Sequence, residues 1–169
     1  MTVTEAIKVR RSIRKYVPGA EVTQEQIDSL LEAAMMAPSA INLRPWEFIV
    51  VRDRDKLQGM MEAHEYAKML GTASLAIVVV GLPRNAPDGF EFFPQDCGAA
   101  TQNILLQAVA MGLGTCWCAV YPNEKRVSQF KELLGIENGI PYCVIAIGVP
   151  DEQPEARGFY DVKKVRYIQ

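Results

Sequence analysis

Four short runs of hydrophobic residues along the chain predict the strands of a core sheet. They are rich in β-branched residues, bounded by polar or glycine-containing segments, and cover Trp46–Val51, Leu75–Gly81, Thr115–Val120 and Pro141–Val149. The second run has no polar residue, which predicts a strand buried on both faces. Trp46 is expected to be a core aromatic residue of the first strand.

Helical periodicity with recognisable caps predicts two helices near the N-terminus. Thr2 and Glu5 have the spacing of a capping box, and this first helix is expected to end in a basic turn, Arg10–Lys15. Thr23 and Gln26 repeat the spacing before an apolar stripe at helical intervals. That stripe consists of Ile27, Leu30, Leu31 and Ala34, and Pro38 should end the helix near Ala37.

Three further helices are predicted between the strands. Asp53 is the expected N-cap of a helix running to about Met69, and Asn123 is that of a helix with Val127, Phe130 and Leu134 on its apolar side. A long helix follows Asp96, with Ala100, Ile104, Ala108 and Met111 among its apolar positions, and ends at Gly112-Leu113-Gly114. The segment Pro83–Pro94, between the predicted strand Leu75–Gly81 and this long helix, is expected to be a loop with three phenylalanines, Phe90, Phe92 and Phe93.

Length and composition indicate one globular domain over residues 1–169. The chain has 49% hydrophobic and 22% charged residues, and no repeat, low-complexity segment or linker divides it. Helices and strands alternate without the regular β-α-β order of a Rossmann unit, and the Gly-Leu-Gly at 112–114 closes a helix instead of opening one. No apolar run is long enough for a membrane span and the N-terminus shows no secretory signal, so we expect a cytoplasmic protein without a membrane partner.

The net charge of −2 hides two basic ends on an acidic body. Residues 1–15 contain five basic residues and one acidic residue, and residues 157–169 contain four and one. An acidic body argues against nucleic acid as a partner. The basic ends suit a small anion held from both sides, although two solvated tails would have the same composition.

Conventional catalytic groups are scarce in this chain. The single histidine, His64, lies between Glu62 and Glu65 in a predicted helix and is expected to be solvated on the surface. Cys116 and Cys118 should share one side of a strand, either as buried core residues or as a soft-metal or redox pair. A bound cofactor is therefore the expected carrier of any reaction.

Four segments together resemble the nitroreductase family of FMN-dependent oxidoreductases. They are Arg10-Arg11-Ser12-Ile13-Arg14, the stretch Ala37–Phe48 with Pro38-Ser39 and Asn42, Asp96–Asn103, and Gly112–Trp117. Their order and spacing also match, and Gly148-Val149-Pro150 before a basic tail adds a fifth match. Arginine forks and a serine hydroxyl are suited to phosphate oxygens.

The resemblance implies an α+β fold and an intertwined homodimer. The fold would be a central, mostly antiparallel sheet flanked by helices, with extended termini around the partner and FMN at the interface. One chain would contribute Arg10, Ser12 and Arg14, with Arg11 as a further candidate, and the other Pro38, Ser39 and Asn42. The backbone of Trp117 to Val120, including Ala119, would lie under the flavin and offer an N–H toward its N5 atom. Lys68 would approach the pyrimidine side, and Arg157 would bind the phosphate, with Lys164 or Arg166 as alternatives.

The activity implied is a two-electron transfer from NADH or NADPH to a nitroaromatic, quinone or related acceptor by a ping-pong mechanism. The chemistry would be carried by FMN, without a catalytic side chain or a metal. Two alternatives remain at this point: a flavin-binding carrier or redox sensor with little turnover, and a thiol or metal protein using Cys116 and Cys118. The phenylalanines of residues 83–94 would form a lid or pack against the partner.

Overall fold

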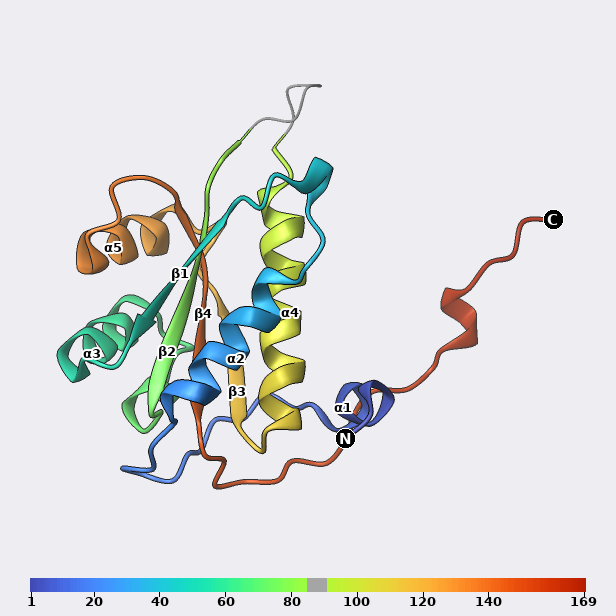
Figure 1. Ribbon diagram of the computed structural model, residues 1–169, viewed down its shortest axis with the longest axis horizontal. Helices are drawn as coiled ribbons and strands as arrows, with labels where there is room; N and C mark the ends of the chain where they lie inside the picture. Colours follow the sequence, from blue (N-terminus) through green and yellow to red (C-terminus); the bar gives the residue numbers. More distant parts are fainter. Residues whose placement is uncertain (85–90) are drawn as a thin grey trace.

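A four-stranded antiparallel sheet lies between two layers of helices in the computed structural model, which describes residues 1–84 and 91–169 (Figure 1). The strands are β1 (Trp46–Val51), β2 (Leu75–Gly81), β3 (Gly114–Ala119) and β4 (Ile140–Gly148), in the spatial order β1-β2-β4-β3. Each adjacent pair is antiparallel. The predicted α+β fold is confirmed, and each strand begins and ends within one residue of its prediction.

Two long helices cover one face of the sheet. Helix α2 (Gln24–Met35) packs beside α4 (Phe93–Ala110), and both lie over the same face of the sheet (Figure 1). Their buried residues, among them Leu30 and Ile104, form one cluster with Ile77 and Ile145. Trp46 belongs to the same cluster, as expected for a core aromatic residue.

Two shorter helices, α3 (Arg54–Ala63) and α5 (Glu124–Leu134), cover the opposite face (Figure 1). Leu57 of α3 and Phe130 of α5 pack with Val78 and Val144 in a second core cluster. Residues of β2 alternate between the two clusters because successive side chains of a strand point to opposite faces. All seven residues of β2 are buried, which confirms that this strand is covered on both sides.

The predicted helix caps are confirmed by their hydrogen bonds. Thr2 and Thr23 each form a complete capping box, at α1 (Val3–Val9) and at α2. The side chain of Asp53 accepts from the backbone N–H of Lys56, and that of Asn123 accepts from the N–H of Arg126. Local sequence therefore determines where these four helices begin.

The prediction that the Asp53 helix runs to about Met69 is wrong. Helix α3 ends at Ala63, because His64 turns into an extended conformation and buries its ring, with only 2% of the residue exposed. A short 3-10 turn, η2 (Lys68–Gly71), follows. The expected surface position of His64 is wrong for the same reason.

Two other boundaries differ from their predictions. Helix α4 begins at Phe93, three residues before Asp96, and Phe93 is buried in the core against Tyr121 and Gly81. Phe93 is therefore neither a lid nor a partner contact, Phe92 is half-buried, and Phe90 lies outside the described residues. A β-carbon at position 81 would clash with the Phe93 ring, so the close packing requires glycine there.

The segment Arg10–Lys15 is extended and not a turn. Ser12 forms a parallel bridge with Thr115 of β3, and the backbone N–H of Ile13 donates to the Thr115 carbonyl at 2.8 Å. The segment continues to Tyr16, which pairs with Pro150. Because β3 is an edge strand, its free backbone groups accept this N-terminal segment as an additional partner.

Both ends of the chain project beyond the body and expose large apolar residues. Figure 1 shows α1 apart from the sheet and the tail after Pro150 running away from it. Val3 and Ile7 of α1 are more than half exposed, as are Phe159 and Ile168 of the tail. Among the helices of the described residues, none combines the length and hydrophobicity needed to cross a membrane.

Candidate functional site

A pocket of about 1050 Å³ lies at the open edge of β3. Its walls come from the extended N-terminal segment, from residues 64–72 after α3, from β3 itself and from the first turn of α5. Four of the residues expected to bind a cofactor line it: Arg14, Lys68, Trp117 and Ala119. The fold therefore brings together residues that are more than one hundred positions apart in the sequence.

The charge of this pocket favours an anionic ligand. Arg14, Lys15, Lys68 and Arg126 line it together with only two carboxylates, those of Glu65 and Asp151. The Arg126 guanidinium is paired with Glu65 at 3.2 Å. Arg14 and Lys68 form no salt bridge with the part of the chain that the structure describes, so their charges remain available to a bound anion.

Glu152 holds the backbone that presents Arg14. One of its carboxylate oxygens, Oε1, accepts the backbone N–H groups of both Arg14 and Lys15. The backbone N–H of Asp151 donates in turn to the Lys15 carbonyl at 2.9 Å. These contacts tie the N-terminal segment to the chain after β4, so the position of the Arg14 side chain depends on residues from both ends of the sequence.

The outer backbone edge of β3 faces the pocket. The carbonyls of Thr115 and Ala119 accept hydrogen bonds from outside the sheet, from Ile13 and from His64. In an antiparallel strand the N–H and C=O of one residue point to the same side, and this side alternates from one residue to the next. The N–H groups of Trp117 and Ala119 therefore point away from β4, as the Thr115 and Ala119 carbonyls do. Val120 is different: it is buried, and its N–H donates to the Tyr142 carbonyl at 3.0 Å.

His64 is a second element of the site and was not predicted. Its Nε2 donates to the carbonyl of Ala119 at 2.8 Å, and its Nδ1 accepts from the backbone N–H of Tyr66 at 3.2 Å. The two partners select the neutral Nε2–H tautomer. Burial lowers the pKa of His64 below its ordinary 6.5, although the hydrogen bond to the Ala119 carbonyl opposes this effect. A neutral ring thus holds one end of the β3 edge.

Tyr66 and Arg126 form the rim of the pocket. The Arg126 guanidinium lies 5.7 Å from the centre of the Tyr66 ring, a cation–π distance, and also contacts Glu65. Tyr66 is 68% exposed, so its ring offers an aromatic surface at the mouth of the pocket. Sequence reasoning missed both residues, because neither belongs to a motif and only the end of α3 at Ala63 brings them to the pocket.

Pro38, Ser39 and Asn42 lie at the opposite end of α4 from this pocket. They flank or belong to the turn η1 (Ala40–Asn42), whose Ala40 N–H donates to Asp96 near the start of α4. The N-terminal segment meets β3 just beyond the other end of α4 (Figure 1). An 18-residue helix is about 27 Å long. Within one chain, these three residues and Arg14 are therefore too far apart to contact the same ligand.

The turn η1 has an unusual backbone. Ile41, Asn42 and Arg44 have φ angles of 43°, 58° and 48°, in the left-handed region that a β-branched residue rarely adopts. Ser39 Oγ accepts the Arg44 N–H at 2.9 Å, and Asn42 Oδ1 accepts from Arg44 Nε at 3.0 Å. Such strain persists only where surrounding contacts enforce it and is common at binding sites.

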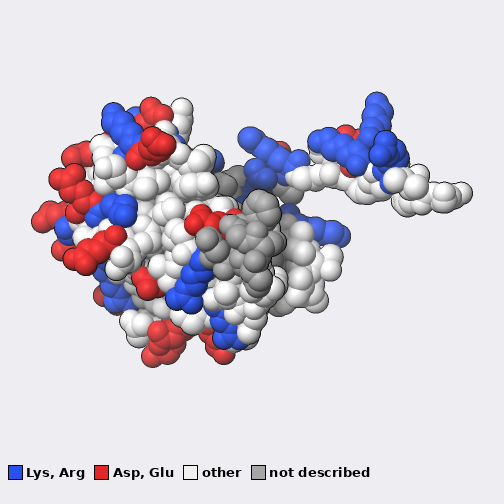
Figure 2. Space-filling view, turned by 90° about the horizontal axis from the view of Figure 1, so that it is seen from above, with Lys and Arg blue, Asp and Glu red and all other residues white. Residues whose placement is uncertain are grey.

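The remaining predicted residues are placed as follows. Arg10 and Ser12 are half-buried on the extended segment, whereas Arg11 lines a separate pocket of about 210 Å³ beside Leu113. Arg157 lies in the exposed tail, as do Lys164 and Arg166. Figure 2 shows Lys and Arg side chains gathered along this projecting tail, while Asp and Glu lie mainly over the body. The tail does not reach the β3 pocket of its own chain (Figure 1).

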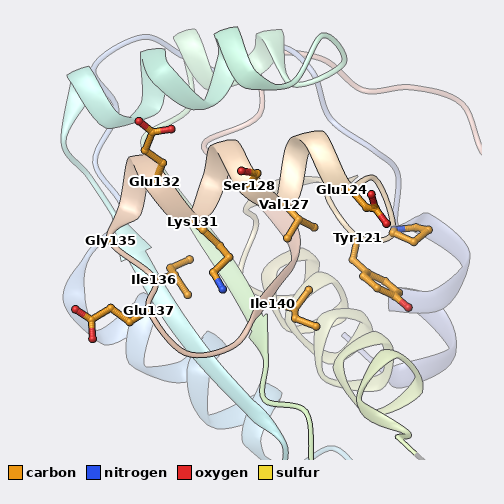
Figure 3. A pocket seen from close by; sticks show the side chains of 11 residues that line it. Tyr121, Glu124, Val127, Ser128, Lys131, Glu132, Gly135, Ile136, Glu137 and Ile140 are labelled. Atoms are coloured by element: carbon orange, nitrogen blue, oxygen red, sulfur yellow. The ribbon is translucent and has the colours of Figure 1, made fainter.

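A second pocket, of about 820 Å³, lies under α5 and contains none of the predicted residues (Figure 3). Val127, Ile136 and Ile140 supply its apolar lining. The Lys131 side chain points into it, whereas the carboxylates of Glu132 and Glu137 point away (Figure 3). Its lining has one cationic side chain, against four in the β3 pocket, so it is the weaker candidate for an anionic ligand.

Comparison with known proteins agrees with the geometry. The sequence model of the nitroreductase family matches residues 7–65 and 55–149. A protein of Methanothermobacter thermautotrophicus named "Putative NADH dehydrogenase/NAD(P)H nitroreductase" is 46% identical over 168 residues, which cover 98% of this chain and 86% of that protein.

Two solved structures share the fold. A crystal structure from Bacteroides thetaiotaomicron with the same name superposes with a TM-score of 0.91 at 43% identity, covering 99% of this chain and 97% of the other. An FMN-dependent nitroreductase from Clostridium difficile has a TM-score of 0.87 at 34% identity, covering 97% and 98% of the two chains.

Proposed function

Because the chain belongs to the nitroreductase family, we propose that it is an FMN-dependent oxidoreductase. It passes two electrons from NADH or NADPH to nitroaromatic, quinone or related electrophilic acceptors by a ping-pong mechanism. The observation that carries the proposal is the β3 pocket, where unpaired cationic groups and an open strand edge converge. The FMN-dependent neighbour of the same fold supports the choice of cofactor.

The residues present fit FMN. The pocket combines the cations Arg14 and Lys68 with the outward N–H groups of Trp117 and Ala119 and the exposed Tyr66 ring. An anionic, planar, hydrogen-bonding ring system can use each of these features. When bound, FMN supplies the hydride chemistry at its N5 atom, so no side chain is required as a catalytic acid or base.

The chain's own groups bind and orient in this proposal. Arg14 and Lys68 stabilise negative charge on the pyrimidine side of the flavin by electrostatic interaction. The N–H of Ala119 or Trp117, and not the occupied N–H of Val120, faces the flavin. His64 holds the Ala119 carbonyl and thereby the orientation of the adjoining peptide groups.

A homodimer completes the site. Pro38, Ser39 and Asn42 come from the second chain, and Arg157 of a tail binds the phosphate together with Arg10 and Ser12. The exposed apolar residues of α1 and of the tail, such as Ile7 and Phe159, support this arrangement, because a partner would cover them. The separation of η1 from Arg14 within one chain supports it as well.

The decisive measurement is the absorption spectrum of the purified protein, followed by anaerobic addition of NADH and then NADPH. We expect flavin bands that bleach promptly and return when an acceptor is added. Flavin bands that neither donor bleaches would indicate a carrier or redox sensor. A protein that does not take up FMN would contradict the proposal.

The Arg14→Ala variant tests the assignment of the site. Loss of a charge-assisted contact should weaken FMN binding by about 10- to 100-fold and lower the flavin reduction potential. Lys131→Ala is the matched control, since it removes a cation from the other pocket. Unchanged flavin content and potential in Arg14→Ala would show that the pocket has been assigned incorrectly.

A further inference from the structure

Three sulfur-containing side chains, all buried, line the wall of the β3 pocket. Cys116 and Cys118 lie on the same face of β3, and both line the pocket together with Met69. The Cys118 Sγ is 3.9 Å from the Met69 Sδ. This cluster has no part in the proposed flavin chemistry, so its presence beside an open pocket needs a separate explanation.

The geometry of the strand excludes a simple disulfide between the two thiols. Residues two positions apart on a strand are about 6.6 Å apart along it. A disulfide requires its β-carbons to be about 3.8 Å apart. A disulfide holds its two sulfur atoms about 2 Å apart. A bound ion allows the two sulfur atoms to be up to about 4.6 Å apart, because it forms a bond of about 2.3 Å to each. The pair is thus suited to holding an ion and poorly suited to oxidation.

The available donor atoms select the kind of ion. A planar three-coordinate site with bonds of about 2.3 Å needs sulfurs about 4 Å apart, close to the observed separation of Cys118 and Met69. His64 cannot add a ligand without losing its bonds to Ala119 and Tyr66. No group of three His, Cys, Asp or Glu side chains with metal-binding geometry occurs in the described ranges, 1–84 and 91–169. Two thiolates and a thioether favour Cu(I) over Zn²⁺.

The thiolate is the form that binds metals, and the environment favours it at Cys116 but not at Cys118. Hydrogen bonding with the Cys118 thiol lowers the pKa of Cys116 to about 7, against the effect of burial, and the charges of Arg14 and Arg10 contribute. Glu152 opposes this shift. The same interaction raises the pKa of Cys118, so binding of an ion would release a proton from that thiol.

The other two cysteines provide an internal comparison. Cys97 and Cys143 lie in the opposite core cluster, where both are fully buried. Burial raises the pKa of each to about 12. The Thr101 hydroxyl lies 3.5 Å from Cys143 Sγ and donates to the backbone carbonyl of Cys97 at 2.7 Å. A pair of neutral thiols in a closed core is inaccessible to an ion.

We propose that Cys116, Cys118 and Met69 form a binding site for a soft monovalent ion of the Cu(I) type in the wall of the β3 pocket. The site lies beside the proposed flavin position, so an occupied site would alter FMN binding. The proposal does not depend on flavin activity, since the three sulfur ligands belong to this chain alone.

An anaerobic titration of the full-length reduced protein with Cu(I), in competition with a coloured Cu(I) chelator, tests the proposal. We expect one ion per chain and removal of the ion from the chelator. Cys116→Ser and Cys118→Ser should each weaken binding by at least about 100-fold, and Met69→Leu by about 10-fold, within the range expected for loss of a ligand or its support. Zn²⁺ should bind more weakly than Cu(I).

Cys97→Ser is the matched control and should bind Cu(I) like the wild type. Circular dichroism and FMN content are measured on every variant, so that a folding defect or a failure of the flavin proposal is recognised separately. Cys116→Ala and Cys118→Ala replace any serine variant that does not fold. Cu(I) that stays with the chelator, or equal losses in Cys97→Ser and Cys116→Ser, would overturn the proposal.

Discussion

The two faces of the sheet are built from the same strands but are covered to different extents. On one face, α2 and the long α4 pack side by side over the strands (Figure 1). On the other face, α3 ends at Ala63, and the N-terminal segment and residues 64–72 line a pocket beside β3. The first face is a closed core, whereas the second contains both a core and the candidate site.

The cysteines show what this difference means for chemistry. Cys97 and Cys143 on the closed face have raised pKa values because burial penalises the thiolate. Cys116 on the open face has a lowered pKa, because it lies beside another thiol and near two arginines. Cys116 and Cys118 are buried core residues too, 3% and 7% exposed, but unlike Cys97 and Cys143 they also line the β3 pocket. Cys118 on the same face has a raised pKa, so the neighbouring thiol, and not the coverage of the face, sets the direction of each shift.

The largest expected effect is a loss of stability when a core side chain is removed from the face covered by α2 and α4. Ile104→Ala removes a fully buried side chain from the closed face and should reduce the free energy of unfolding by about 3 to 4 kcal/mol. Ile49→Ala, at a half-buried position against the other cluster, should cost only about 1 kcal/mol. Urea denaturation of both variants measures the difference. Equal losses would show that Ile49 is packed as tightly as Ile104.

An intermediate effect is expected where the N-terminal segment closes the open face. The Tyr16 hydroxyl is buried and lies 2.9 Å from the Ile13 carbonyl and 3.2 Å from that of Ala146. Tyr16→Phe leaves both carbonyls without this donor and should lower stability by about 1 to 2 kcal/mol. Tyr66→Phe, with an exposed ring, is the control and should have almost no effect in the same denaturation assay. If Tyr16→Phe left the free energy of unfolding unchanged, other contacts would hold the N-terminal segment in place.

The smallest effect concerns pH and the neutral His64 ring. Burial lowers the pKa of His64, so below its ordinary value of 6.5 the unfolded chain binds a proton that the folded protein does not. The contribution of His64 to the free energy of unfolding is therefore fully present above pH 6.5. It decreases as the pH falls, by at most about 1 kcal/mol between pH 6.5 and 5.5. Thermal unfolding at pH 7.5 and 5.5 measures it.

His64→Gln supplies the control for this pH effect. His64 is the single histidine of the chain, so the variant removes every imidazole titration. Its stability should be lower than that of the wild type at pH 7.5 but should change less between the two pH values. An unchanged pH dependence in His64→Gln would assign the effect to carboxylates.

Several site residues could be predicted because they occur in local patterns. The Arg10–Arg14 motif, Lys68 and the Trp117–Val120 strand were selected from the sequence and its family resemblance, and five residues of these segments line one pocket. His64, Tyr66 and Arg126 could not be predicted in this way. Their role depends on the early end of α3, and a periodic pattern of apolar residues continues past that point without marking it.

The amino-acid sequence by itself determined where the four strands lie and where four of the helices begin. Thr2, Thr23, Asp53 and Asn123 act on backbone N–H groups within three residues, and the strands follow from runs of apolar residues. Only the tertiary structure decided which face stayed open, because that depends on how far each helix reaches across the sheet. It also decided that His64 is buried, since its partner Ala119 lies 55 residues away in the sequence. A capping hydrogen bond depends on residues that are neighbours in the sequence. A pocket depends on how segments that are distant in the sequence pack against one another.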